Sequence, residues 1–169
     1  MKYIYVTGFV LPFTVEAVMA NLSDVAGVRI ICEFVDDIYT IAAMLAMQDD
    51  LKLIKIKDYI KYPKDNGYRS YHMIVEIPVF FSKGKTPMRV EIQIRTIAMD
   101  FWASLDHELK YKKDIDPNEE QMIAAELLSC ADRIAETDMI MQQIRMRLDS
   151  VEGNKESEEI VIDEEIIEE

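Results

Sequence analysis

The sequence predicts an α+β domain with a mixed, mainly antiparallel sheet flanked by helices. Four short segments alternate apolar and polar residues with the two-residue period of a β-strand. Other segments repeat apolar residues every three or four positions, as amphipathic helices do. The order of these segments shows no internal repeat and no sustained strand–helix–strand rhythm, which argues against a parallel α/β protein. With 169 residues, the chain is long enough for one domain with a hydrophobic core.

The first half of the domain is predicted to contain two strands with a helix between them. Residues 28–34 (VRIICEF) place Arg29 and Glu33 on one face of a strand and apolar side chains on the other, namely Val28, Ile30, Cys32 and Phe34. Asp36 or Asp37 can cap the following helix, whose apolar stripe consists of Ile38, Ile41, Ala42 and Leu45. Residues 51–60 (LKLIKIKDYI) predict the second strand, because lysines alternate there with Leu51, Leu53, Ile54 and Ile56.

A β-hairpin is predicted next, over residues 71–80 and 88–95 with the turn SKGKTP between them. The first strand points His72 and Glu76 outward and buries Tyr71, Met73, Val75 and Ile77. The second strand (MRVEIQIR) has an apolar face and a polar face formed by Arg89, Glu91, Gln93 and Arg95. Pairing of the strands would bring His72 and Glu76 onto the face of Glu91 and Gln93. That face is either an active-site wall or a half-exposed edge of the sheet.

Two helices are predicted after the hairpin. The first, residues 97–109, is expected to bury Ile97, Phe101 and Leu105, with Trp102 as a core residue and His107 at the surface. The second, about 118–151, has an apolar seam with a period near 3.5 residues that only Thr137 interrupts. Its members are Ile123, Leu127, Cys130, Ile134, Met141, Ile144, Leu148 and Val151. Such a helix either closes the core of a monomer or pairs with a helix of another copy.

The charge of the chain is unevenly distributed. The formal net charge is −13, and the last 18 residues hold nine acids and one lysine, so the first 151 residues carry about −5. We therefore expect a domain over residues 1–151 and a disordered acidic tail over 152–169, and no binding to DNA. The chain has no apolar run of membrane-spanning length, no convincing signal peptide and only two cysteines. A cytoplasmic location is expected.

One loop carries an unusual density of cations and aromatic rings. Residues 58–72 (DYIKYPKDNGYRSYH) have turn residues at Pro63 and at Asn66-Gly67. Their cations and tyrosines suit a nucleotide, because a ring can stack on the base while cations meet the phosphates. The loop is therefore a candidate nucleotide-binding segment.

Four sequence motifs resemble a known family. DVAGVRI (24–30), YPKDNGYRSYH (62–72), VEIQIRT (90–96) and MDFWASLDHELKYK (99–112) are similar to the synthetase domain of the RelA/SpoT alarmone enzymes. The likeness runs from about residue 9 to 150 and is greatest to the small alarmone synthetases, which are GTP pyrophosphokinases. It implies transfer of pyrophosphate from ATP to the 3′-hydroxyl of GTP or GDP, making (p)ppGpp in the stringent response. A nucleotidyltransferase-like fold, Mg²⁺ and a homotetramer are also implied.

The resemblance assigns roles to individual residues. Asp24 matches the metal-binding aspartate, and Glu91 matches a second acid near the metal that activates the 3′-hydroxyl. Tyr68 matches the tyrosine that stacks on guanine. The remaining positions are expected to line the GTP or GDP pocket, to contact phosphate or to orient the acids; they are Lys64, Asn66, Arg69, His72, Gln93 and Arg95.

The sequence departs from the family pattern before Asp24. The family builds its ATP site there from a Gly-Arg-x-Lys-Ser type motif and a cationic helix, whereas this chain has no Lys, Arg or His between Lys2 and Arg29. A start placed too late, an internal deletion, or loss of pyrophosphate transfer would each explain the difference. Two hypotheses follow: an alarmone synthetase, or a catalytically impaired guanine-nucleotide-binding or regulatory module of the same family.

Overall fold

The computed structural model describes residues 3–6, 9–12, 26–82, 84–110 and 116–165, and side chains over 26–82, 84–107 and 116–151. Strands β1 (Tyr3–Val6) and β2 (Phe9–Pro12) form a separate antiparallel pair. The remaining elements are β3 (Gly27–Cys32), α2 (Val35–Ala46), β4 (Lys52–Asp58), β5 (Tyr71–Phe81), β6 (Gly84–Thr96), α3 (Ile97–Lys110) and α4 (Pro117–Glu165).

A four-stranded sheet with the order β3-β6-β5-β4 forms the centre of the domain. Strand β3 runs parallel to β6, and the other two pairings are antiparallel. The fold is thus α+β with a mixed, mainly antiparallel sheet, as predicted. In the β5–β6 pair, His72 lies opposite Gln93 and Ile74 opposite Glu91. The predicted polar face is therefore confirmed.

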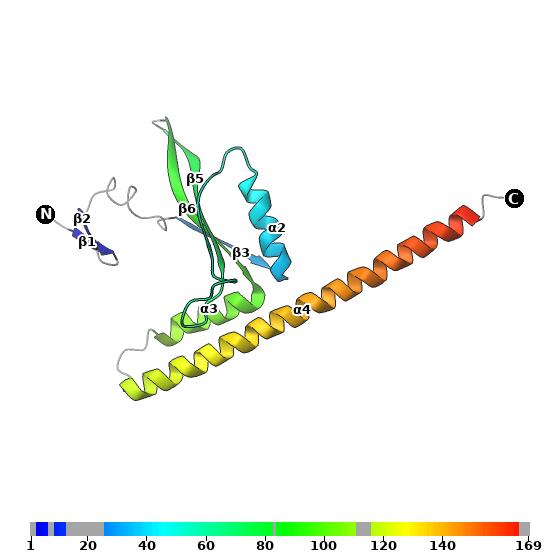
Figure 1. The fold of residues 1–169 in the computed structure, drawn as a ribbon. Coiled ribbons are helices and arrows are strands. Elements are labelled where there is room, and N and C mark those ends of the chain that lie inside the picture. The colour runs from blue at the N-terminus through cyan, green and yellow to red at the C-terminus, as the bar shows by residue number, and fades with distance from the viewer. Residues whose placement is uncertain (1–2, 7–8, 13–25, 83, 111–115, 166–169) are drawn as a thin grey trace.

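The core lies between the sheet and α2. Alternate residues of β5 and β6 point toward α2, where Ile38 and Ala42 meet them. Figure 1 shows α2 beside the sheet, with α3 and α4 across the end of the sheet where β6 finishes. The buried core residues are Cys32, Ile38, Ala42, Met73, Val75, Val90, Ile92, Ile94 and Met99.

Strand β4 is an edge strand with a bulge. The register shifts between Leu53 and Lys55, so one extra residue is accommodated there. As a result, Lys52, Lys55 and Lys57 lie opposite Glu76, Ile74 and His72 and share their face of the sheet. The expected simple alternation of buried and exposed residues is wrong for this strand, since Leu53, Ile54 and Ile56 are all exposed.

Helix α3 buries a different face from the one expected. Ile97, Phe101 and Leu105 are exposed, whereas Met99, Trp102 and Asp106 are buried. Helix α4 causes the difference, because it packs on the side of α3 that carries Trp102. The Trp102 indole Nε1 donates a 3.0 Å hydrogen bond to the carbonyl of Leu127 on α4. The expectation that Trp102 belongs to the core is correct.

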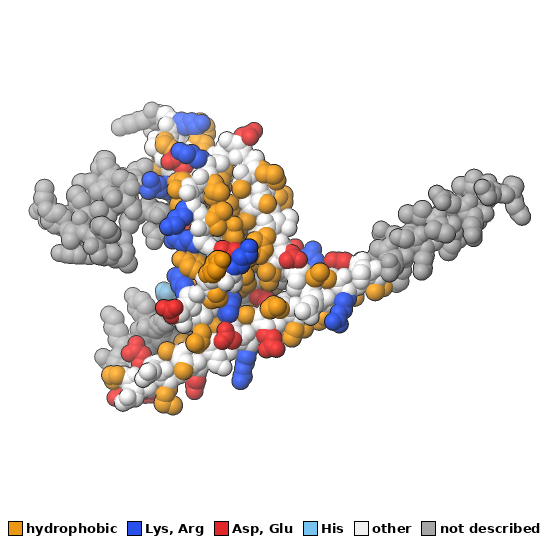
Figure 2. All heavy atoms as spheres, in the orientation of Figure 1, with side chains coloured by type: hydrophobic (Ala, Val, Ile, Leu, Met, Phe, Trp, Pro, Cys, Tyr) orange, Lys and Arg blue, Asp and Glu red, His pale blue; other side chains and the backbone are white. Residues whose placement is uncertain are grey.

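Helix α4 contacts the domain through polar residues as much as through its apolar seam. Asp138 accepts a hydrogen bond from Thr96, Gln142 pairs with Asp36, and Arg145 pairs with Asp37. Within the seam, Ile123, Leu127 and Ile134 are partly buried, but five members are exposed, namely Cys130, Met141, Ile144, Leu148 and Val151. Apolar side chains along the described part of α4 are visible at the surface in Figure 2.

The backbone of α4 continues through the position where the sequence places the start of an acidic tail. The helix extends beyond the sheet and ends at Glu165 (Figure 1). The division of the chain at residue 151 remains a prediction. Among the described residues, no helix is both long enough and apolar enough to cross a membrane.

Candidate active site

The loop between β4 and β5 folds by local hydrogen bonds from its own turn residues. Asp58 Oδ1 accepts from the backbone N–H groups of Ile60 and Lys61, each at 3.0 Å. Farther along, Asn66 Oδ1 accepts from the N–H of Tyr68 at 3.3 Å. Gly67 has a φ of 84°, a conformation that glycine adopts most readily. The predicted turn at Asn66-Gly67 is confirmed, and it directs Tyr68 back over the sheet.

Each carboxylate oxygen of Glu91 is held by a hydrogen bond from another side chain. His72 Nδ1 lies 3.0 Å from Oε1, and Gln93 Nε2 lies 3.0 Å from Oε2. Partial burial raises the pKa of the Glu91 carboxyl, but the hydrogen bonds from Gln93 and His72 outweigh it, with a smaller effect of Lys57, so the pKa falls below its ordinary value. Glu91 is therefore a fixed, ionised carboxylate at neutral pH.

His72 is the buried link between Glu91 and the loop. Its Nε2 lies 2.8 Å from the hydroxyl of Tyr68. Burial lowers the pKa of His72, and the nearby charges of Arg95 and Lys57 lower it further, against the opposing effect of Glu91. A neutral imidazole with its proton on Nδ1 satisfies both contacts, because a carboxylate can only accept.

Arg95 is also buried and uses its guanidinium entirely within the site. Its Nη2 donates to the Tyr68 hydroxyl at 2.6 Å and to Gln93 Oε1 at 2.8 Å. The other nitrogens donate to Asp100 at 3.0 Å and to Ser70 at 3.2 Å. Of the two roles expected for Arg95, this geometry favours orientation of neighbouring groups over direct contact with a phosphate.

The ring of Tyr68 is surrounded by cations and aromatic groups. Lys64 Nζ lies 4.8 Å from the ring centroid, and the Arg95 guanidinium carbon lies 5.2 Å from it. Tyr59 packs edge-on against Tyr68 and His72, with centroid separations of 5.9 and 5.2 Å. Positive charge over an aromatic face suits an anionic ligand that carries a flat base.

Two residues expected in the nucleotide pocket, Asn66 and Arg69, also contact the helices. Asn66 Nδ2 donates to Asp106 of α3 at 3.3 Å. Arg69 donates to the carbonyl of Ala131 and to Asp132 on α4, each at 3.2 Å. The site thus brings together Tyr68, His72, Glu91, Gln93 and Arg95, with Lys64 beside them. Asn66 attaches the loop to α3, and Arg69 attaches it to α4. Asp24 lies outside the described residues.

Sequence reasoning missed three contributors to the site. Lys57 lies opposite His72 on β4, and its position follows from the strand register once the bulge is known. Ser70 and Asp100 hold Arg95. Asp100 follows Arg95 by five residues, a spacing that gives no signal unless the strand-to-helix junction at Thr96 is known.

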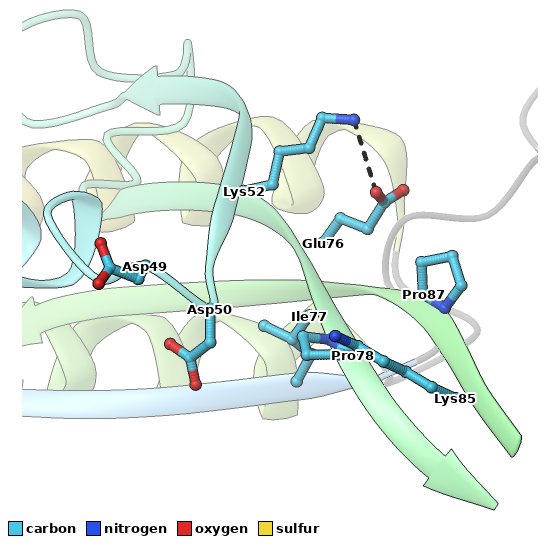
Figure 3. A pocket seen from close by; sticks show the side chains of 8 residues that line it. All are labelled: Asp49, Asp50, Lys52, Glu76, Ile77, Pro78, Lys85 and Pro87. Carbon is cyan, nitrogen blue, oxygen red and sulfur yellow. Dashed lines mark ion pairs between the residues drawn. The ribbon is translucent and has the colours of Figure 1, made fainter.

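The sheet also has a hollow that is separate from this site (Figure 3). It lies toward the β5–β6 turn, where Lys52 Nζ pairs with Glu76 Oε1 at 3.5 Å. Its lining combines both signs of charge and consists of Asp49, Asp50, Lys52, Glu76, Ile77, Pro78, Lys85 and Pro87. None of the described residues that were expected to bind nucleotide or metal lies in this lining.

The described part of the site offers a metal ion one carboxylate. Within the residues described with side chains, no cluster of three or more His, Cys, Asp or Glu residues could hold a metal ion. Each Glu91 oxygen accepts only one of the hydrogen bonds above, so each retains acceptor capacity. A Mg²⁺ site built from one or two carboxylates and substrate phosphates is compatible with that donor set.

Comparison with known proteins identifies the family. The sequence model of the protein family described as the region found in RelA/SpoT proteins matches residues 14–116, which is more than half of the chain. The chain belongs to the RelA/SpoT family. It is 50% identical over 103 residues to the GTP pyrophosphokinase YwaC of Bacillus subtilis, covering 61% of this chain and 49% of that protein. It is 40% identical over 125 residues to the GTP pyrophosphokinase YjbM of the same organism, covering 74% and 58%.

A solved structure within the family shares the fold. The small alarmone synthetase 1 from Bacillus subtilis, bound to its product pppGpp, superposes with a TM-score of 0.72 at 35% identity. The match covers 80% of this chain and 68% of that one. This RelA/SpoT chain spans between about a half and three-fifths of the length of the two curated relatives. All four motifs that carry the resemblance lie within the matched residues 14–116.

Proposed function

We propose that this chain is a GTP pyrophosphokinase that moves the β,γ-pyrophosphoryl group of ATP onto the 3′-hydroxyl of GTP or GDP. The 3′-oxygen attacks the β-phosphorus, the bond from that phosphorus to the α–β bridging oxygen breaks, and AMP leaves. The product is pppGpp when GTP is the acceptor and ppGpp when GDP is the acceptor. The observation that carries the proposal is Glu91, an ionised carboxylate fixed at both oxygens beside the cation-rich Tyr68 loop. Its occurrence in a RelA/SpoT chain, similar to a synthetase solved with pppGpp, supports it.

The acceptor nucleotide is proposed to lie between the loop and the polar face of the sheet. The Tyr68 ring stacks on guanine, and Lys64, already within 4.8 Å of that ring, supplies positive charge. Glu91 accepts the proton of the 3′-hydroxyl as the new bond forms, which makes the oxygen a better nucleophile. His72, Gln93 and Arg95 maintain the orientation of Glu91, whereas Asn66 and Arg69 hold the loop.

Mg²⁺ is proposed to bind Asp24 and Glu91. The backbone N–H of Glu91 donates to the carbonyl of Ala26 at 2.9 Å. Asp24 is two residues from Ala26, and two residues span at most about 7 Å, so chain connectivity supports its approach to Glu91. When bound, the ion would offset the negative charge of the phosphates.

A catalytically impaired guanine-nucleotide module is the second candidate. It is favoured by the absence of Lys, Arg and His between Lys2 and Arg29, where the family carries the cations that meet ATP. A triphosphate without cationic partners would keep strong uncompensated charge. This candidate predicts GTP binding without product.

A homo-oligomer, a tetramer by family resemblance, is also proposed. Its support is the exposed part of the α4 seam, in which Met141, Ile144, Leu148 and Val151 are each 43–59% exposed. An apolar period near 3.5 residues suits helix–helix pairing. The cytoplasmic location expected from the sequence remains a prediction.

The test of the proposed function is product formation by the purified chain. The chain is incubated with GTP or GDP, ATP and Mg²⁺, and nucleotides are separated by anion-exchange chromatography. We expect pppGpp or ppGpp with an equal amount of AMP, and neither product when ATP or Mg²⁺ is omitted. Calorimetry with GTP alone separates the candidates, because binding without product supports the impaired module. If the chain neither binds GTP nor forms product, both candidate functions are contradicted.

A further inference from the structure

The polar groups of the site form a closed ring of hydrogen bonds. From Arg95 Nη2, one arm passes through the Tyr68 hydroxyl and His72 to Glu91 Oε1, with contacts of 2.6, 2.8 and 3.0 Å. The other arm passes through the side-chain amide of Gln93 to Glu91 Oε2, with contacts of 2.8 and 3.0 Å. A buried cation and the carboxylate are thus connected twice, through neutral groups.

With His72 neutral, one arrangement of protons satisfies every contact in the ring of hydrogen bonds. Arg95 can only donate and the Glu91 carboxylate can only accept, so the Tyr68 oxygen accepts from Arg95 and His72 Nδ1 donates to Glu91. The neutral imidazole then accepts at Nε2, and the Tyr68 hydroxyl donates to it. The Gln93 amide accepts at its oxygen from Arg95 and donates through its nitrogen to Glu91. All the hydrogen bonds therefore point from Arg95 toward Glu91.

Neither the sequence motifs nor base stacking gives a role to the Tyr68 hydroxyl, which is part of this ring of hydrogen bonds. A ring that only stacked on a base would work equally well as phenylalanine, because stacking uses the aromatic face. Here the hydroxyl instead completes the hydrogen bonding of two buried groups, Arg95 and His72. Its removal leaves a donor and an acceptor without partners in a buried network, which is costly.

We propose that the Tyr68 hydroxyl is a positioning group that orients Glu91 through His72, in addition to the stacking role of the Tyr68 ring. This inference rests on the proposed function, in which Glu91 accepts the proton of the 3′-hydroxyl. A tilted His72 would let the carboxylate rotate away from the line of proton transfer, and proton transfer depends on such geometry. Tyr68→Phe should therefore reduce kcat more than it raises KM for GTP.

The test compares the parent with Tyr68→Phe and with the control Tyr62→Phe. Tyr62 is in the same loop but is 77% exposed and is not part of the ring of hydrogen bonds. We expect Tyr68→Phe to lower kcat by about tenfold or more, with KM for GTP and GTP affinity within about threefold because the ring is retained. Tyr62→Phe should match the parent.

A spectroscopic measurement of the full chain reports on the ring without any turnover. The chain has two histidines, His72 and His107, so a long-range ¹H–¹⁵N spectrum contains two imidazoles, which His107→Gln assigns. We expect His72 to show the Nδ1–H tautomer in the parent and to change its Nε2 shift in Tyr68→Phe, while His107 stays unchanged. Circular dichroism verifies that Tyr68→Phe is folded.

The outcomes distinguish the positioning role of the Tyr68 hydroxyl from the proposed pyrophosphokinase function. An active parent with an unchanged kcat in Tyr68→Phe overturns the positioning role and leaves the proposed function intact. An unchanged His72 spectrum in Tyr68→Phe overturns the hydrogen-bond ring itself. A parent that makes no product contradicts the proposed function and the positioning role together.

Discussion

The hydroxyl of Thr96 donates a 2.6 Å hydrogen bond to the carboxylate of Asp138, 42 residues farther along the chain. The Thr96 oxygen also accepts from the backbone N–H of Met99 at 3.1 Å. One buried side chain therefore starts α3 and holds α4 against the end of β6. Because Thr96 directly follows Arg95, this contact fixes α4 next to the hydrogen-bond ring of the site.

Replacing Asp138 with asparagine should raise stability at neutral pH. Burial raises the pKa of Asp138 above its ordinary value of 3.8, despite the hydrogen bond from Thr96. Between the ordinary and the raised pKa, the folded protein holds more protons than the unfolded chain, so the free energy of unfolding falls as pH rises. Asparagine cannot ionise and still offers Thr96 an acceptor. Urea unfolding between pH 4 and 8 should show the advantage of Asp138→Asn growing with pH through that window. An advantage that is independent of pH would contradict this explanation.

Gly67→Ala should loosen the nucleotide loop from α4. An added Cβ at Gly67 would lie 2.5 Å from Ala131 Cβ and 3.2 Å from Leu128 Cδ1. We expect about 1–3 kcal/mol of destabilisation from overpacking and about 1–2 kcal/mol from the left-handed backbone, measured by urea unfolding. GTP affinity should fall as well, because the same loop carries Tyr68.

Two comparison variants isolate the contact between Gly67 and Ala131. Combining Gly67→Ala with Ala131→Gly should cost less than the sum of the single changes, because the clash is relieved while the backbone strain remains. Gly84→Ala serves as a control, since Gly84 also has a positive φ but has no neighbour within 4 Å of an added Cβ. Additive costs would show that Ala131 does not hold the loop.

Charge on the exposed part of α4 should dissociate an oligomer without unfolding the domain. Met141 and Leu148 are 49% and 59% exposed, so Met141→Glu with Leu148→Glu leaves the core described above unchanged. Light scattering should show a smaller species than for the parent, at an unchanged melting temperature. Met47→Glu at the C-cap of α2, where Met47 is 74% exposed, is the matched control. A parent that is monomeric at every concentration would refute self-association.

The sheet face of the site could be predicted because a strand has a period of two. The alternation of Val90 to Arg95 placed Glu91, Gln93 and Arg95 together, and hairpin pairing added His72. The turn at Asn66-Gly67 was also predictable, because a turn of this kind depends only on the chemistry of neighbouring residues.

The features that failed depend on partners distant in sequence. The buried face of α3 was wrong because α4 covers Trp102 rather than Phe101. Arg69, which was expected to contact phosphate or to orient the acids, donates to the carbonyl of Ala131 on α4, 62 residues away, and its role toward a nucleotide remains a prediction. The bulge in β4 places Lys57 beside His72; the pair Leu53-Ile54 interrupts the alternation at that point, but the strand pairing that Lys57 reaches depends on β5.

The most direct test of Glu91 as the general base is the rate of pppGpp formation by Glu91→Gln, measured together with its affinity for GTP. Glutamine has nearly the same size but cannot take up the proton of the 3′-hydroxyl. We expect synthesis to fall by about 100-fold or more, while GTP affinity and the unfolding midpoint remain close to those of the parent. Synthesis of pppGpp by Glu91→Gln at the parent rate would contradict the role of Glu91 as the general base.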